Sequence, residues 1–501
     1  MKKITGTYGV ILITSLFSLN LSAKEAADDA NYENADKTVR HMVRNLSRPW
    51  LPNGLPFNNT TGISATESSA GYIDLNNPFF QDLGSNARRC VSCHLPNTGW
   101  TITPAFTRAV FDFTQGGVMD DGVGLGAIFR TNDGSNSPLA DVSTSAARRK
   151  AYSMLLTKGL IRIGIAIPAN ADFQLVEVDD PYGYASAKEL SLFRRPLPAT
   201  NLGFLSTVML DGRETFAGSD HCNIPDEGGK CFASLNFDLL DQANSAVMTH
   251  AQGKPLTSAQ QEAIVTFETS LATAQFRDYR AGGLREAGGR GGAEEIETQM
   301  NAVHYGVNDN FGDYQTGAPF NPNVFTLYSR WSNAKYYGQA AIARGEKLFN
   351  TRTIPITGVA GLNGSQGSPF TPPFPDTFNG TCTTCHDTPN GGNHSIVAPL
   401  NIGVSDATRR TPDMPLYTFQ RLTDGALLQS TDPGRALITG KFADIGKFKG
   451  PVLRGLAARA PYFHNGSAKD LNASVDFYNQ RFNLNFTQQE HDDLVAFLGA
   501  L

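Results

Sequence analysis

Two copies of the pattern C-x-x-C-H occur in this chain of 501 residues. In this pattern two thiols can add to the vinyl groups along one edge of a haem, and the histidine that follows them can bind the iron. Composition alone would produce about 0.001 such patterns in a chain of this length, so two copies are a strong signal. The sequence therefore predicts two covalently attached haem c groups. The attachment residues are Cys90, Cys93, Cys382 and Cys385, and the proximal iron ligands are His94 and His386.

The other two cysteines point to a disulfide. Cys222 and Cys231 flank a run of turn-forming residues. In an exported protein such a pair is typical of a disulfide, although a reactive thiol pair has the same spacing. A zinc site is the rival interpretation of the C-x-x-C pairs, and it lacks the second pair that such a site needs.

The N-terminus has the pattern of a secretory signal peptide over residues 1–23. Lys2 and Lys3 precede a short apolar stretch that ends on the small residue Ala23. An uncleaved anchor is the alternative, but the stretch is broken by hydroxyl residues and is shorter than the ~20 apolar residues of a membrane span. We therefore expect a periplasmic protein that does not span the membrane.

Composition excludes one large class of function. The chain has 42 basic and 47 acidic residues, a net charge of −5, and so lacks the basic excess of a nucleic-acid-binding protein. Its 49 glycines and 27 prolines favour a loop-rich protein over a plain helical bundle.

A repeated helix pattern indicates the elements that position the haem motifs. Segments 257–271 and 487–501 each begin with Thr and carry apolar residues at helical spacing. Residues 341–350 resemble the first helix of the second unit, where Gly345 would let two helices approach closely. These elements predict a mainly α fold, with two cytochrome c-like haem domains in tandem and loop-rich insertions.

The same repeat sets the expected domain boundaries. After the signal peptide, an N-terminal domain over 24–275 would hold the reactive haem. A Gly-rich connection over 276–335 would lead to a C-terminal domain over 336–501 that holds the electron-transfer haem. The first unit is longer than the second, and we place its extra residues within 120–205.

Three further motifs identify a family resemblance. The chain has M-L-D-G-R at 209–213, F-K-G-P-V-L-R at 448–454 and P-Y-F-H-N-G at 461–466. Together with the two haem motifs, and in this order, they resemble the bacterial di-haem cytochrome c peroxidase and MauG superfamily. The resemblance extends over roughly residues 75–501, with long insertions.

The resemblance implies a periplasmic di-haem c-type oxidoreductase that reduces H₂O₂. Its electrons would come from a small redox protein, a cytochrome c or a cupredoxin. Two alternatives stay open: a MauG-like oxidase or haem oxygenase acting on another substrate, and a non-enzymatic electron-transfer cytochrome. Family members often pair as homodimers, so the resemblance also implies a dimer.

The resemblance implies a sixth ligand for the C-terminal haem. In the family a Met or Tyr lies fourteen residues after the histidine of P-Y-F-H, and here that position is Tyr478, counted from His464. A phenolate ligand would lower the haem potential. Met414 is the rival ligand and would raise it. His464 could also bind the iron, although we expect a pocket or structural role for it.

The resemblance also implies polar groups beside the N-terminal haem. Gln242 matches the family's distal glutamine. Ten residues later the family has an acid, but this chain has Gln252, so His250 is the candidate acid–base group and Glu214 a weaker one. Arg213 of the D-G-R motif completes the candidate catalytic set.

Further positions bear on cofactor binding and electron transfer. Arg213 and Arg454 would suit haem propionates or ordinary ion pairs. Leu210 stands where the family has a tryptophan that relays electrons between the haems. The resemblance further implies a calcium ion held by backbone and Asn oxygens, with Gly450 at a position where relatives often have Thr. The candidate replacements for the relay are Trp100, Trp331, Tyr336 and Tyr337.

Overall fold

The structure is a computed structural model in which part of the chain is described. The described residues are 37–215, 224–225, 231–232, 235–364 and 375–501. The predicted signal peptide and the predicted disulfide of Cys222 lie outside them. Within the described residues, no helix is both long enough and apolar enough to cross a membrane.

The predicted fold class, mainly α, is wrong. Helices account for 33% of the chain and strands for 17%, in several small sheets, so the fold is mixed α/β. The strands were missed because they are short and pair with distant segments. For example, β3 (Gly62–Ser68) pairs with β10 (Leu271–Asp278), in which nearly every side chain is buried. Such a strand shows no alternation of polar and apolar residues.

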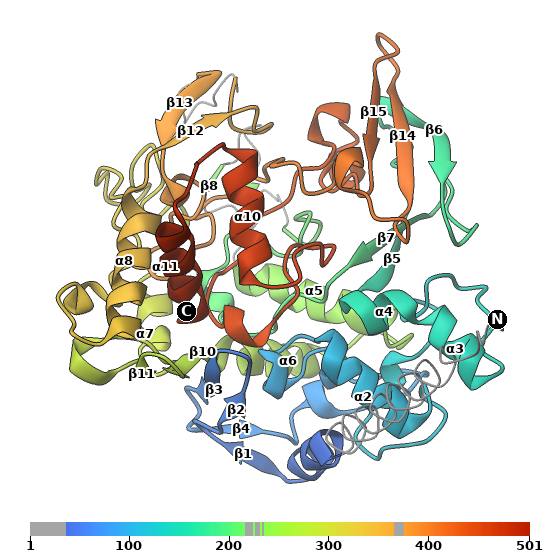
Figure 1. Ribbon diagram of the computed structural model, residues 1–501. Helices are drawn as coiled ribbons and strands as arrows, with labels where there is room; N and C mark the ends of the chain where they lie inside the picture. Colours follow the sequence, from blue (N-terminus) through green and yellow to red (C-terminus); the bar gives the residue numbers. More distant parts are fainter. Residues whose placement is uncertain (1–36, 216–223, 226–230, 233–234, 365–374) are drawn as a thin grey trace, which may run out of the picture.

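The N-terminal half combines a four-stranded sheet with three main helices. The sheet has the order β11-β10-β3-β2, and α6 runs directly into β10. A separate two-stranded ribbon, β1 with β4, lies nearby (Figure 1). The bounds are β1 Trp50–Pro52, β2 Phe57–Asn58, β4 Tyr72–Asp74, α2 Pro104–Thr114, α5 Leu235–Thr249, α6 Ser258–Ser270 and β11 Gly282–Gly283.

An aromatic cluster forms the core behind the first haem motif. Phe79, Phe80, Trp100 and Phe267 pack with ring centroids 5.1 to 6.5 Å apart, mostly edge to face. The His94 ring lies 6.3 Å from Phe79 and so packs against this cluster. Rigid packing of this kind holds a ligand side chain in one rotamer.

The C-terminal half is built on α8 (Tyr337–Thr351), α10 (Leu471–Arg481) and α11 (Gln488–Gly499). The predicted close approach at Gly345 is confirmed, because a Cβ there would lie 2.0 Å from the Asp493 carbonyl oxygen of α11. The two repeated helices are also confirmed. α6 and α11 each begin after a threonine whose side chain accepts a hydrogen bond from the third helical amide.

The remaining strands join segments far apart in the chain. β5 pairs with β7, and β12 pairs with β13. A three-stranded sheet of order β15-β14-β6 combines β6 of the N-terminal half with two strands of the C-terminal half, on the opposite side of the view from α8 and α11 (Figure 1). The bounds are β5 Ile161–Ile165, β6 Phe173–Asp179, β7 Leu190–Arg194, β12 Ile354–Thr357, β13 Thr377–Gly380, β14 Leu416–Arg421 and β15 Leu427–Ser430. The shorter elements are α3 Ser145–Ala151, α4 Ser153–Lys158, β8 Ile224–Pro225, β9 Cys231–Phe232, α7 Ile296–Asn301 and α9 Ala436–Thr439.

A buried ion-pair network also links the two halves. The Arg194 guanidinium donates to Asp211 at 2.6 Å and to Asp432 at 2.6 Å, and all three side chains are buried. Burial alone would raise the pKa of Asp211, but Arg194 and Arg213 lower it to about 2. Arg194 therefore connects the Asp of the D-G-R motif to Asp432 in the other half of the chain.

Candidate haem-binding pockets

The first haem motif lines a pocket in the N-terminal half, called the N-terminal pocket below. Cys90–Ser92 form a single helical turn, and the amides of Cys93 and His94 donate to the Cys90 carbonyl at 3.1 and 3.0 Å. The turn brings both thiols and the imidazole to the pocket wall. His94 Nδ1 donates to the Trp100 carbonyl at 3.1 Å, which leaves Nε2 to bind a metal. Burial lowers the pKa of His94 to about 4, so the ring is in its neutral, ligating form.

The second haem motif repeats this geometry in the C-terminal half. Cys382–Thr384 form the turn, and His386 lies on the wall of a second pocket, the C-terminal pocket. His386 Nδ1 donates to the Gly392 carbonyl at 2.5 Å, which again leaves Nε2 free for iron. Burial lowers the pKa of His386 as well.

The two pockets share a wall that carries unpaired positive charge. Among the described residues, no carboxylate pairs with Arg195, Lys449 or Arg459, and their side chains donate hydrogen bonds to backbone carbonyls. Burial lowers the pKa of Lys449 to about 7 and that of Arg459 to about 10. Arg459 Nε is buried and has no hydrogen-bond partner. The shared wall consists of Arg195, Pro196, Leu197, Pro198, Leu210, Lys449, Pro451, Val452 and Arg459.

This wall fits the haem groups that the motifs predict. Each haem carries two propionate carboxylates. Buried cations that have no carboxylate partner in the protein are the groups with which such propionates would pair. The attachment thiols, the free imidazole nitrogens and the unpaired cations are therefore all groups that a bound haem c would use. The residues present are compatible with a c-type haem in each pocket.

The three predicted catalytic residues lie together on the N-terminal pocket wall. Gln242 projects from α5, His250 follows that helix, and Arg213 comes from the D-G-R motif. His250 Nδ1 bonds Asp133 Oδ2 at 2.5 Å, and Arg88 forms an ion pair with the same carboxylate. Burial would raise the pKa of Asp133, but Arg88 and His250 lower it. The carboxylate therefore stays charged and holds the His250 ring by one nitrogen.

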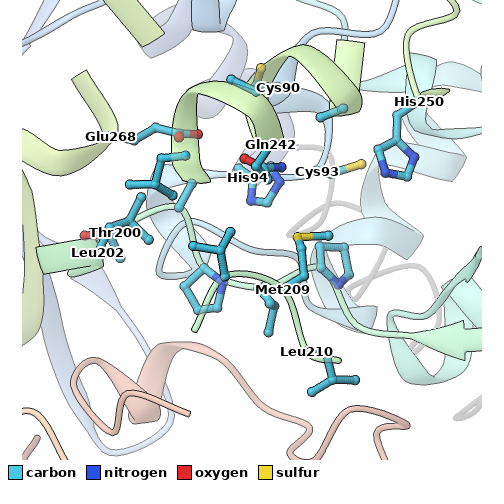
Figure 2. Close-up of a pocket in the computed structure, with 18 of the residues that line it drawn as sticks. Cys90, Cys93, His94, Thr200, Leu202, Met209, Leu210, Gln242, His250 and Glu268 are labelled. Carbon is cyan, nitrogen blue, oxygen red and sulfur yellow. The ribbon is translucent and has the colours of Figure 1, made fainter. Parts of the chain in front are cut away.

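A carboxyl group absent from the sequence prediction lies at the other end of the same pocket. Figure 2 shows Glu268 beside Cys90, whereas His250 lies on the far side of His94. Burial raises the pKa of Glu268 to about 8. The two repeated helices place Leu498 at the equivalent position of the C-terminal pocket. The acid is therefore a feature of one pocket and is replaced by an apolar side chain in the other.

The C-terminal pocket contains two of the three groups considered as its sixth ligand. Tyr478 on α10 and His464 both line it. Burial raises the pKa of the Tyr478 phenol. His464 stacks on Phe448 with ring centroids 4.2 Å apart, and its Nε2 has no hydrogen-bond partner. Met414 lines neither haem pocket and packs in a separate apolar cluster with Met154.

The structure also locates the predicted relay position, Leu210, and the second predicted propionate ligand, Arg454. Leu210 is in the shared wall, and the nine residues of that wall include no aromatic side chain. Arg454 is buried and donates to backbone carbonyls, including those of Leu501 and Gly292, and it lines neither haem pocket. Of the candidate relays, Trp100 and Trp331 are buried in the cores, whereas Tyr336 and Tyr337 are exposed.

Several residues of the site were missed at the level of sequence. Asp133 lies 117 positions from His250, and no spacing rule connects them. Lys449 and Arg459 meet Arg195 only through the fold. Glu268 had a detectable signal, because it interrupts the apolar face of a repeated helix whose second copy has Leu498.

Comparisons with known proteins bear on the family. None of the known protein-family models matches the chain. Cytochrome-c peroxidase IdrP2 of Denitromonas iodatirespirans is 35% identical over 135 residues, 25% of this chain and 37% of that protein. The IdrP2 peroxidase of Pseudomonas sp. strain SCT is 28% identical over 192 residues, 35% of this chain and 52% of that protein. Cytochrome c551 peroxidase of Nitrosomonas europaea is 39% identical over 69 residues, 14% of this chain and 21% of that protein.

Over these segments the chain is similar to cytochrome c peroxidases. The resemblance found in the sequence motifs is thereby confirmed. The matches span between about a fifth and a half of these relatives' own lengths. A solved structure of a MauG-like protein associated with microbial copper homeostasis aligns over 90% of this chain and 92% of its own. Its identity is 15% and its TM-score 0.36, which is too low for a comparison of folds.

Proposed function

We propose that this chain is a periplasmic di-haem oxidoreductase that reduces hydrogen peroxide with electrons from a cytochrome c or a cupredoxin. Cys90, Cys93 and His94 would hold the reactive haem, and Cys382, Cys385 and His386 the electron-transfer haem. The observation that carries the proposal is the difference between the pockets. The N-terminal pocket has the Asp133–His250 pair and Glu268 on its wall, and the equivalent of Glu268 in the C-terminal pocket is Leu498.

We assign the two proposed roles, peroxide reduction and electron uptake, to the two predicted haem domains. The unit over 24–275 would carry out the peroxide reaction, and the unit over 336–501 would receive electrons, with 276–335 as the connection. Arg195, Lys449 and Arg459 would bind propionates from both haems at the shared wall. A calcium ion and a homodimer remain predictions from the family resemblance.

A haem c at His94 would supply the electron exchange that reduces the peroxide bond. The chain's own residues would bind the substrate and move its protons. Arg213 and Gln242 offer hydrogen bonds that orient peroxide in the pocket. His250 would accept a proton at Nε2 and deliver it to the departing oxygen, because Asp133 occupies Nδ1 and stabilises the charged ring. Each H₂O₂ takes up two electrons and two protons and yields two water molecules.

Steady-state turnover of the holoprotein tests the proposal. We expect H₂O₂-dependent oxidation of a reduced cytochrome c or cupredoxin, and consumption of two donor molecules per peroxide. An absence of turnover with every small redox donor, in protein with full haem content, would refute the peroxidase function. A resting spectrum in which both irons are six-coordinate and unreactive would instead indicate an electron carrier.

One observation favours a second candidate function. The shared wall has no aromatic side chain and Tyr478 lines the C-terminal pocket, so a MauG-like oxidase or oxygenase acting on another substrate is the alternative. Such an enzyme would consume peroxide without oxidising a small donor protein. Product analysis after stopped-flow mixing with H₂O₂, with and without donor, separates the two reactions.

A substitution at Tyr478 tests the proposed ligand of the C-terminal haem. If the phenolate binds the iron, Tyr478→Phe should change the EPR and optical spectra and raise the potential of this haem. Met414→Leu is the control, because Met414 lines neither haem pocket. Identical spectra in Tyr478→Phe and the parent protein would exclude ligation by this tyrosine and favour His464.

A further inference from the structure

Two loops meet beside the second haem motif and bring three buried ligand groups together. The first loop follows α7. Its Asn308 side chain donates to the Asp387 carbonyl at 3.1 Å. Its Asn310 side chain donates to the Thr384 carbonyl at 2.6 Å. These bonds hold the loop against the haem motif and place Asp309, between the two amides, in the protein interior.

The second loop continues from the haem motif itself. Asp387 accepts a hydrogen bond from His394 Nδ1 at 3.0 Å and another from the Ser395 amide at 2.6 Å. Asp309, Asp387 and His394 each offer one ligand atom, and these atoms all lie within 4.8 Å of one another. The exposed fractions of the three residues are 1%, 0% and 7%, so water does not surround the cluster.

The cluster carries more negative than positive charge. A protonated His394 would balance one carboxylate and leave the other without a counter-charge. In the part of the chain that the structure describes, neither Asp309 nor Asp387 forms an ion pair with Lys or Arg. Burial raises the pKa of Asp309, and the neighbouring Asp387 carboxylate adds to that rise. Buried charges in proteins are normally paired or bound to a metal ion.

A second observation concerns buried polar groups beside Asp387 and His394 in the chain. Ser395 is buried, its amide donates to Asp387, and its hydroxyl has no hydrogen-bond partner within the part of the chain that the structure describes. Thr388 Oγ1 and Asn393 Oδ1 of the same loop are also buried without partners. Native structures leave few such groups unsatisfied, and an ion or water is the usual explanation. These three residues are the immediate neighbours of Asp387 and His394 in the chain.

We propose that Asp309, Asp387 and His394 bind a divalent transition-metal ion, Zn²⁺ or Mn²⁺. Carboxylates suit Mn²⁺ and imidazole suits Zn²⁺, whereas Ca²⁺ prefers six to eight oxygen ligands. The ligand set therefore differs from the calcium site that the family resemblance implies, which uses backbone and Asn oxygens. His394 also lines the C-terminal pocket, so the ion would lie beside that pocket. The site does not depend on the peroxide reaction.

Metal analysis of the full-length holoprotein tests the site. After exhaustive dialysis against metal-free buffer, we expect one equivalent of Zn or Mn per chain in addition to haem iron. Protein stripped with a chelator should unfold at a lower temperature, and added Zn²⁺ or Mn²⁺ should restore the midpoint. This measurement uses the parent protein, so it remains valid if a variant fails to fold.

Substitutions then assign the ligands. Asp309→Asn and His394→Gln should lose the additional equivalent of metal and the effect of the chelator on the unfolding midpoint. Asp313→Asn is the matched control, because Asp313 belongs to the same loop but pairs with His304. It should retain the metal. Haem content and peroxide turnover are measured separately, so failure of the proposed function is distinguishable from failure of this site.

Three results would overturn the proposal. The first is dialysed parent protein that contains no metal other than iron and does not rebind Zn²⁺ or Mn²⁺. The second is retention of the metal by both Asp309→Asn and His394→Gln. The third is Ca²⁺ as the sole bound ion, which would contradict the ion class that the imidazole ligand selects.

Discussion

His250 depends on a partner that determines which of its nitrogens faces the pocket. Asp133 binds Nδ1, and Arg88 holds Asp133 from the other side. A carboxylate in this position orients the ring and stabilises its charged form. Glu268, at the opposite end of the pocket, has no such partner among the described residues, and burial raises its pKa. The N-terminal pocket therefore contains one group arranged to exchange protons and one arranged to retain its proton.

Asp133→Asn tests the role of the His250 partner. The amide keeps the shape but cannot stabilise a charged ring, so kcat/KM for peroxide should fall by about 10²-fold. The pH profile should also shift, which a purely structural change would not produce. Asp112→Asn, at an exposed ion pair with Arg149, is the control and should leave both unchanged. An unaltered pH profile in Asp133→Asn would contradict the proposed proton transfer.

Glu268→Gln tests the buried acid through stability. The pKa of Glu268 is about 8 in the folded protein against an ordinary value of 4.5. The folded state therefore binds one more proton than the unfolded state between these values, and this group makes stability fall as pH rises from 4.5 to 8. Glu268→Gln should remove this contribution to the fall of the unfolding free energy with pH. Glu262→Gln, exposed on the same helix, should keep it. Denaturant titrations of the holoprotein give the unfolding free energy at pH 5 and at pH 8.5. An equal change in this free energy between the two pH values in Glu268→Gln and Glu262→Gln would contradict the raised pKa of Glu268.

Local spacing determined which site residues were predictable. The attachment cysteines and their histidines stand at the fixed spacing of the C-x-x-C-H motif, whereas Gln242 and His250 were proposed from the family resemblance. The cations of the shared wall do not, because Arg195 and Arg459 are 264 positions apart and meet only after the halves pack. Arg454 is a residue that its motif singles out but that the fold uses differently. The motif suggests a propionate ligand, whereas the guanidinium donates to backbone carbonyls.

At the scale of elements, three helices were predicted from the sequence, over 257–271, 341–350 and 487–501, and none of the strands was. α6 and α11 carry their own start signals, a threonine cap with Gln or Glu three residues later. β6 and β14 have no comparable local signal, because each depends on a partner in the other half of the chain. Helix formation uses neighbours in sequence, whereas sheet pairing here uses distant segments.

The contact of α8 with α11 can be tested at Gly345. A methyl group there would lie 2.0 Å from the Asp493 carbonyl oxygen, so the helices would have to separate. Gly345→Ala should therefore lower the free energy of unfolding by about 1–3 kcal/mol, despite the better helix propensity of Ala. Lys347→Ala, exposed on the same helix, should change it by less than ~0.5 kcal/mol. A stabilised Gly345→Ala, measured by denaturant unfolding, would contradict the close packing.

At the scale of the whole molecule, Arg194 connects the two halves through Asp211 and Asp432. Arg194→Met would leave the buried Asp432 without its arginine and Asp211 with Arg213 alone, which should cost about 3–5 kcal/mol. Arg285→Met, at an exposed pair with Glu294, is the control and should cost less than ~1 kcal/mol.

The same network has a defined pH dependence. The pKa of Asp211 is about 2 in the folded state against an ordinary 3.8. Its contribution to stability is therefore fully present above 3.8 and is lost as pH falls through 2. The midpoint of thermal unfolding, measured from pH 2 to 7, tests this contribution of Asp211. Midpoints that change with pH in the same way in Arg194→Met and the parent protein would contradict the proposed role of the Arg194–Asp211 pair.

The sheet of β6 with β14 also sets an order of events during synthesis. Glu177 of β6 bonds Thr418 of β14, a residue made 241 positions later. The first half therefore leaves the ribosome with the edge of β6 unpaired, and its Glu177 and Asp179 are the charges that discourage wrong pairing. A nascent chain that stalls before β14 would keep this edge open, and the strand could then pair with a second copy of the chain.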